Sequence, residues 1–92
     1  MQLHNTGTDP TWRLEGRYDQ DSLLKIQQKL TGLKQQGDLI LDVADLETIN
    51  APVIALLLEL RRHSRSLTLA RCRDDYREML QLYGLENMFD FA

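Results

Sequence analysis

The sequence predicts an α/β fold: a mixed β-sheet with helices packed mainly on one face, in the order β-β-α-β-α-β-α. Three observations lead to this prediction. Short apolar or alternating segments typical of strands recur along the chain, longer segments with apolar residues three and four apart lie between them, and turn-forming residues mark the junctions. Strands separated by helices pair in parallel, and 92 residues suffice for one core, so we expect a single domain over 1–92.

The N-terminal segment predicts a β-hairpin. A turn marked by Gly7 and Pro10 precedes 11–16, where Trp12 begins an alternation of apolar and polar residues typical of a half-buried strand. Leu3 and its neighbours are expected to form the weaker partner strand.

An amphipathic helix is predicted over 23–36. Residues 19–22 offer several N-caps, and Gly37 is placed to end the helix just past its last residue. Gly32 in the last turn costs about 1 kcal/mol relative to alanine, so we expect that end to fray. One face carries the apolar stripe Leu23, Ile26, Leu30 and Leu33.

The middle of the chain predicts a strand, a helix and a further strand. The apolar run 39–43 is typical of a central strand covered on both faces. Asp42 is expected to end this strand, and Asp45 to lie in the turn that follows. A helix over 52–65 and a strand over 67–70 come next.

The C-terminal part predicts a third helix and a packed tail. Asp74 or Asp75 is expected to cap the helix, and Gly84 to end it. The tail is expected to pack back as a short helical turn or an edge strand, because it holds three large apolar residues. The helix stripe is Tyr76, Met79, Leu80 and Tyr83, and the tail residues are Met88, Phe89 and Phe91.

Composition excludes several classes of protein. A net charge of −3 argues against a nucleic-acid binder. The single cysteine, Cys72, has no intramolecular partner, and no secretory leader precedes the domain, so a cytoplasmic setting is expected. The longest uncharged run, 48–58, is too short for a membrane span, which predicts no direct insertion into a membrane.

No motif predicts an enzyme, a cofactor or a metal site. The glycine-rich phosphate loops are missing, and His4, His63 and Cys72 share no metal-ligand spacing. Asp42 and Asp45 could pair as carboxylates, but a strand end and a turn explain them better. Neighbouring arginines could lower the pKa of the Cys72 thiol, although an idle thiol is the favoured interpretation.

The charge is uneven along the chain. Residues 1–60 carry a net −4, residues 61–77 carry six arginines and a net +4, and residues 78–92 carry −3. The arginines could form a docking face for an acidic protein or a phosphate group. For most of them individually, a solvated helix end favoured by the helix dipole is the preferred interpretation.

The segment that opens the second helix is the most informative. Asn50 is a good N-cap, and Pro52 suits a first helical turn. Beyond one core stripe, Ile54 and Leu58 widen the apolar face of this helix. Either the helix is sandwiched within its own domain or part of it packs on a partner, and we favour the partner.

This segment resembles the STAS domain, the fold of anti-sigma-factor antagonists. The resemblance rests on a strand ending at Asp42, a short loop containing Leu46, and an apolar helix opened eight residues after Asp42. Signalling members carry Asp-Ser/Thr-Ser/Thr-Gly at the helix opening, with a phosphorylated hydroxyl. Here the positions read Asn50-Ala51-Pro52-Val53, so that switch cannot operate, and Thr48 lies before the motif.

A narrower resemblance links the chain to the MlaB family, the STAS subunits of bacterial Mla phospholipid transporters. It rests on residues 16–23 with their Asp-Gln-Asp motif, on 53–60, and on 82–85. It implies a cytoplasmic accessory subunit, held at the inner membrane by an MlaF-like ABC ATPase that works with a permease to maintain outer-membrane lipid asymmetry. Many members carry threonine at the position of Ala51.

The resemblance implies docking through the start of the second helix and part of the third. Arg62, Arg65 and Tyr76 are further candidate anchors, although core packing explains Tyr76 and Tyr83 at least as well. A helix start exposed for docking predicts that Ala51→Glu or Val53→Asp would abolish partner binding without unfolding the domain. The predicted partner-binding residues are Asn50, Ala51, Pro52, Val53, Ile54, Arg61 and Tyr83.

Two other functions stay open. An anti-sigma-factor antagonist that binds its kinase-type partner without being phosphorylated would share the fold. A weaker idea is that the basic segment binds a nucleotide or a lipid, which no phosphate-binding motif supports.

Overall fold

A computed structural model describes residues 1–5, 11–31 and 36–92, which form one five-stranded sheet with three α-helices. The sheet order is β1-β2-β3-β4-β5; β1 and β2 are antiparallel, and the other neighbours are parallel. The predicted fold class is confirmed. The elements are β1 (Gln2–Asn5), β2 (Thr11–Glu15), α1 (Gln20–Thr31), β3 (Gln36–Asp42), α2 (Ala51–Arg62), β4 (Ser64–Ala70), α3 (Asp74–Leu82), the 3-10 helix η1 (Glu86–Met88) and β5 (Asp90–Phe91).

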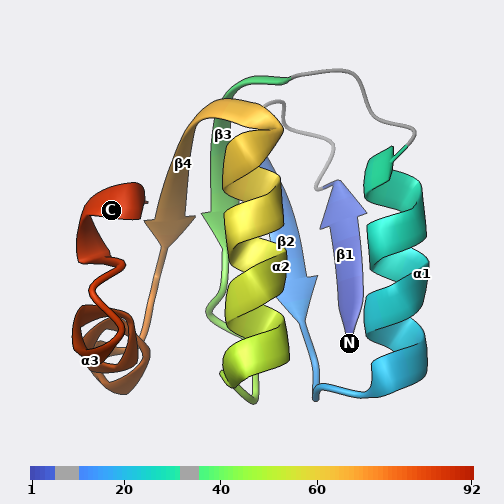
Figure 1. The fold of residues 1–92 in the computed structure, drawn as a ribbon, viewed down its shortest axis with the longest axis horizontal. Helices are drawn as coiled ribbons and strands as arrows, with labels where there is room; N and C mark the ends of the chain where they lie inside the picture. The colour runs from blue at the N-terminus through green and yellow to red at the C-terminus, as the bar shows by residue number, and fades with distance from the viewer. Residues whose placement is uncertain (6–10, 32–35) are drawn as a thin grey trace.

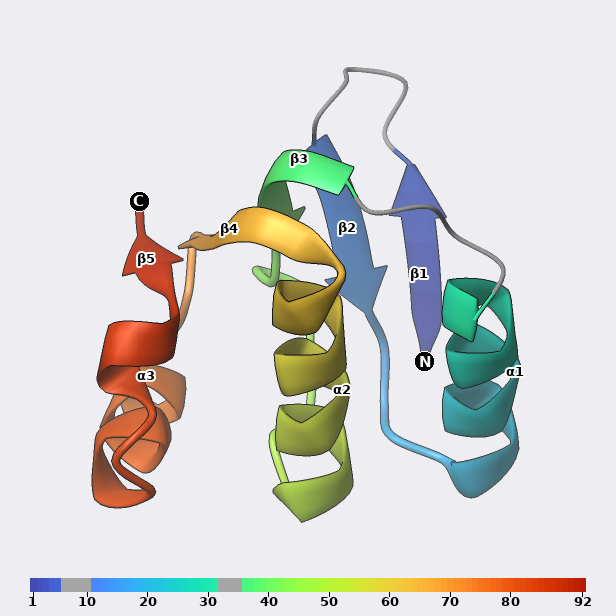
Figure 2. The same cartoon turned by 45° about the horizontal axis from the view of Figure 1, so that its top comes forward.

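The three α-helices cover one face of the sheet (Figures 1 and 2). Parallel strands that follow one another across a sheet in chain order place their right-handed crossover helices on the same side. Helix α2 lies over the centre of the sheet, α1 beside β1, and α3 on the side of β4 and β5 (Figure 1). The prediction of helices mainly on one face is thereby confirmed.

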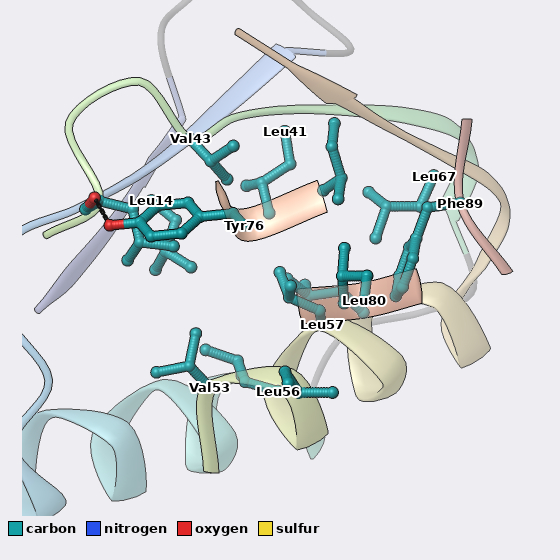
Figure 3. Close-up of a cluster of buried hydrophobic side chains, with 14 of the residues drawn as sticks. Leu14, Leu41, Val43, Val53, Leu56, Leu57, Leu67, Tyr76, Leu80 and Phe89 are labelled. Carbon is teal, nitrogen blue, oxygen red and sulfur yellow. Dashed lines mark hydrogen bonds between the residues drawn. The ribbon is translucent and has the colours of Figure 1, made fainter. Parts of the chain in front are cut away.

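The core fills the space between the sheet and the helices (Figure 3). Leu41 of β3 and Leu67 of β4 are at most 1% exposed, as are Leu56 and Leu57 of α2 and Leu80 of α3. Side chains at alternate strand positions point to opposite faces of a sheet, so only one set of each strand enters this core.

The expectation that 39–43 is covered on both faces is wrong. Leu39, Leu41 and Val43 are buried, whereas Ile40 and Asp42 between them are only half-buried. The reason is the placement of the helices, since all three lie on the side of the buried set. A continuous apolar run therefore does not require a second layer.

Helix α1 is shifted toward the N-terminus relative to the prediction. Its cap is Asp19, whose carboxylate accepts the Ser22 N–H at 2.8 Å and whose carbonyl accepts the Leu23 N–H at 3.1 Å. The helix ends at Thr31 rather than at 36, and Gly37 lies in β3 instead of ending the helix. Residues 32–35 of the predicted helix, which include Gly32 and Leu33, lie outside the described residues.

Helix α2 ends at Arg62 rather than at 65, and β4 begins at Ser64. The buried Ser64 hydroxyl donates to the Leu60 carbonyl at 2.9 Å and thus satisfies an acceptor that the helix leaves free at its end. Strand β4 therefore begins almost directly after the last turn of α2.

The cap predicted for α3 is wrong, whereas its end is confirmed. Arg73 is the N-cap residue and provides no side-chain cap, while Asp74 and Asp75 lie in the first turn, where acidic side chains suit the helix dipole. At the other end Gly84 has φ +71, and its N–H bonds the Gln81 carbonyl at 2.9 Å. The next residue's N–H bonds the Leu80 carbonyl, which completes a Schellman motif.

The tail takes both of the expected forms. Residues 86–88 form η1, and β5 adds a two-residue parallel strand to the edge of β4. Phe89 is buried and Phe91 packs against the core, whereas Met88 is 42% exposed.

Candidate functional site

The start of α2 is capped as predicted. The Asn50 side-chain oxygen accepts the Val53 N–H at 3.1 Å, and the Asn50 carbonyl accepts the Ile54 N–H at 2.8 Å. Pro52 lies in the first turn, where its missing N–H is not needed. Ala51 is exposed and Pro52 is half-buried, so the helix opening presents two small apolar residues at the surface.

The loop that leads from β3 into α2 is fixed to the neighbouring β2–α1 connection. The Gly16 N–H donates to the Asp45 carbonyl at 3.0 Å, and the Glu47 N–H donates to the Gly16 carbonyl at 2.9 Å. Gly16 has φ +92, a left-handed conformation that favours glycine. In the middle of the loop, Leu46 is 2% exposed and anchors the segment in the core.

The same loop is held from the other side by α3. The Tyr76 hydroxyl donates to the Leu46 carbonyl at 2.6 Å (Figure 3), and the Arg73 guanidinium lies 4.7 Å from the centre of the Tyr76 ring. Burial raises the pKa of Tyr76, so the phenol stays protonated and keeps its donor. Tyr76 is 4% exposed and belongs to the core, whereas Tyr83 is 57% exposed at the end of α3.

The wide apolar face of α2 is explained within the domain. Val53 is 0% and Ile54 5% exposed, and Leu58 is half-buried against the core. Helix α2 packs on β4 beneath it and on α1 beside it, and so uses more of its circumference than a single stripe. The preference for a partner as the explanation of Ile54 and Leu58 is therefore wrong, and Val53→Asp would place a charge in the core.

The apolar residues that remain exposed lie elsewhere. Leu82 is 83% exposed and adjoins Tyr83, while Leu24 on α1 is 53% exposed. Leu82 was missed by sequence reasoning, although its position outside the stripe of the third helix was a usable sign. The surface thus combines Ala51 and Pro52 at the α2 opening with a separate apolar group at the end of α3.

Arg61 does not lie near that opening. It stands ten residues along α2 from Ala51, about 15 Å at the helical rise of ~1.5 Å per residue. Its Nε donates to the Met88 carbonyl at 3.1 Å, and a terminal nitrogen donates to the Ser64 carbonyl at 3.2 Å. Arg61 therefore fastens η1 to the end of α2.

Most other arginines of 61–77 form intramolecular pairs rather than a free basic patch. Arg62 pairs with Glu59 at 3.4 Å, and Arg73 pairs with Asp75 at 2.9 Å. The remaining pairs are Arg71 with Asp42 and Arg77 with Glu86, the latter at 3.6 Å. Carboxylates thus neutralise much of the local positive charge, which disfavours a phosphate-binding role.

Asp42 pairs with Arg71 and not with Asp45. The hydrogen bond from Arg71 holds the pKa of the Asp42 carboxyl below its ordinary value, and the Ala44 N–H also donates to it at 3.0 Å. Arg71 itself has φ +54, a conformation that side-chain-bearing residues rarely adopt. The Arg71–Asp42 pair ties the ends of β3 and β4 together, so the structure does not support Asp42 and Asp45 as a carboxylate pair for acid–base chemistry.

The Cys72 thiol is not activated, because burial outweighs the opposing effect of Arg77 on its pKa. Burial raises the pKa of its thiol, and the Arg71 side chain turns to Asp42 instead. Within the described residues, no group of three His, Cys, Asp or Glu side chains could hold a metal ion. In the same part of the chain, no helix has the length and apolarity needed to cross a bilayer.

The domain has a mixed five-stranded sheet with helices on one face. Its third strand leads through a hydrogen-bonded loop into an apolar helix with an asparagine cap. Together these features define a STAS-type α/β domain. Residues 1–90 match the family model described as "Mlab, STAS domain". The chain belongs to this STAS domain family. A search of curated proteins found no match.

Proposed function

We propose that this chain is a non-catalytic accessory subunit that binds the ATPase of an Mla-type phospholipid ABC transporter. The observation that carries the proposal is the match, over residues 1–90, to a STAS family described by the name Mlab. In this role the subunit acts in the cytoplasm, is held at the inner membrane through the ATPase and its permease, and supports the maintenance of outer-membrane lipid asymmetry.

The exposed start of α2 is the proposed docking surface. Ala51 and Pro52 offer apolar area on a backbone fixed by the Asn50 cap, so little ordering is needed on binding. Burial of apolar surface contributes about 25 cal/mol per Å² before these costs are subtracted. Tyr83, with its neighbour Leu82, is the proposed second contact.

The other predicted binding residues act indirectly in this proposal. Asn50 fixes the first turn, Val53 and Ile54 anchor it in the core, and Arg61 fastens η1. None of these four side chains needs to touch the partner for its replacement to weaken binding.

Affinity purification of the tagged chain from its native host tests this function. Recovery of an ABC ATPase together with its permease is the expected result. Recovery of a kinase-type anti-sigma factor instead would contradict the proposal and favour the antagonist function. In that case binding would be constitutive at this site, since Ala51 and Pro52 carry no hydroxyl to phosphorylate.

A further inference from the structure

The Tyr76 hydroxyl is not needed for the packing of the Tyr76 ring. The ring lies in the core, and a phenylalanine would fill the same space. The hydroxyl instead reaches out of α3 to the Leu46 carbonyl, in the loop that enters α2 (Figure 3). This is a contact between segments 30 residues apart in the chain.

The loop has attachments on both sides. Its bonds to Gly16 fix it to the connection between β2 and α1, and the Ala44 N–H bonds the Asp42 carboxylate at 3.0 Å. The Tyr76 hydroxyl is the attachment that comes from α3. Four residues after Leu46 comes Asn50, the cap that fixes the direction of α2.

We infer that Tyr76 is a positioning residue that joins α3 to the start of α2, so that the docking surface is formed before the partner arrives. The inference rests on the proposed function, because the surface it positions is the one proposed to bind the ATPase. A loop free to leave this arrangement would reduce the fraction of binding-competent molecules and thereby the apparent affinity.

The molecule provides a matched control for this inference. Ser64 also donates a buried hydroxyl hydrogen bond to a backbone carbonyl, that of Leu60, at 2.9 Å. This bond lies at the opposite end of α2 from Ala51. Tyr76→Phe also removes a longer bond from Arg73 to the hydroxyl at 3.4 Å, and Ser64→Ala a longer bond to the Arg61 carbonyl at 3.3 Å. The two variants are therefore matched in the bonds they remove, and only the first removes a link to the loop.

The test compares wild type, Tyr76→Phe and Ser64→Ala by amide hydrogen exchange of the isolated domain and by calorimetric titration with the ABC ATPase subunit. We expect Tyr76→Phe to speed exchange at the Leu46 and Glu47 amides about fivefold, the size of one net hydrogen bond. Binding should weaken measurably but by no more than the same factor, because apparent affinity falls only with the binding-competent fraction. Ser64→Ala is expected to leave both unchanged, with its effect confined to the end of α2.

Loop exchange and affinity equal in Tyr76→Phe and Ser64→Ala would overturn the inference. Faster loop exchange without weaker binding would overturn it as well, because positioning would then not matter for docking. If the wild-type domain does not bind the ATPase, the proposed function fails, and the exchange comparison still decides whether Tyr76 holds the loop.

Discussion

Neighbouring residues at the start of α2 have different physical roles. Ala51 is exposed, whereas Val53, two positions later, is 0% exposed in the core. Successive helical residues are rotated by about 100°, so two positions separate a surface residue from a buried one. A substitution at this site therefore tests either docking or folding, depending on the residue chosen.

Val53→Asp is predicted to unfold the domain. The carboxylate would enter an apolar core without a partner, at a cost of about 3 kcal/mol or more in the free energy of unfolding. Circular dichroism and thermal melting measure this loss. Ala55→Asp, on an exposed position of the same helix, is the control and should melt close to wild type; similar melting of both variants would contradict the assignment of Val53 to the core.

Asp42→Asn is predicted to destabilise the domain at neutral pH and much less in acid. The pKa of Asp42 is lowered in the folded state, chiefly by Arg71, so its contribution is complete above its unfolded pKa of about 3.9 and is lost as pH falls through the lower folded value. Urea denaturation at pH 7 and at successive values below about 4 measures the difference. If the difference in free energy of unfolding between variant and wild type does not narrow in acid, the charge of Asp42 is unimportant for stability.

At the scale of elements, capping and turn geometry decide where helices begin and end. Asn50 and Gly84 were identified correctly because each follows a strong local preference. Helices α1 and α2 end before the predicted residues, because β3 begins at Gln36 and β4 at Ser64. Strand pairing across the sheet is not encoded in any single segment, so these limits could not be predicted locally.

Gly84→Ala is predicted to lower stability by about 1 kcal/mol. An added Cβ would meet nothing within 4 Å, so the cost comes from the left-handed backbone at φ +71 alone. Gly37 is the matched control, because its added Cβ would also meet nothing and no positive φ is involved. Gly37→Ala should be neutral or slightly stabilising in urea denaturation; equal losses in both variants would exclude the backbone explanation.

At the scale of the whole molecule, a one-sided arrangement of layers explains what sequence patterns could not predict. The element order and the fold class followed from the pattern of strands and helices. The burial of Ile54 could not be predicted, because it depends on how α1, α2 and the sheet pack together. The same is true of two of the arginines, whose carboxylate partners come from separate segments: Arg71 pairs with Asp42, and Arg77 pairs with Glu86.

Only the local part of the candidate site could be predicted from the sequence. The capped helix opening at Asn50 and the exposed Ala51 follow from local sequence. The burial of Tyr76 and the exposure of Tyr83 could not be predicted, since both lie on one apolar stripe. Periodicity groups these two tyrosines, and only the packing at each end of the helix separates them.

The central claim is that the α2 opening binds the ABC ATPase, and Ala51→Glu tests it most directly. A glutamate in the first turn suits the helix dipole, so the fold should be retained. Calorimetric titration of the ATPase subunit with wild type, Ala51→Glu and Leu24→Glu, a control at an exposed apolar residue of α1, measures the effect. We predict that Ala51→Glu binds at least about tenfold more weakly, because the interface would bury one unpaired charge, and that Leu24→Glu binds like wild type. Wild-type affinity in Ala51→Glu would contradict the account.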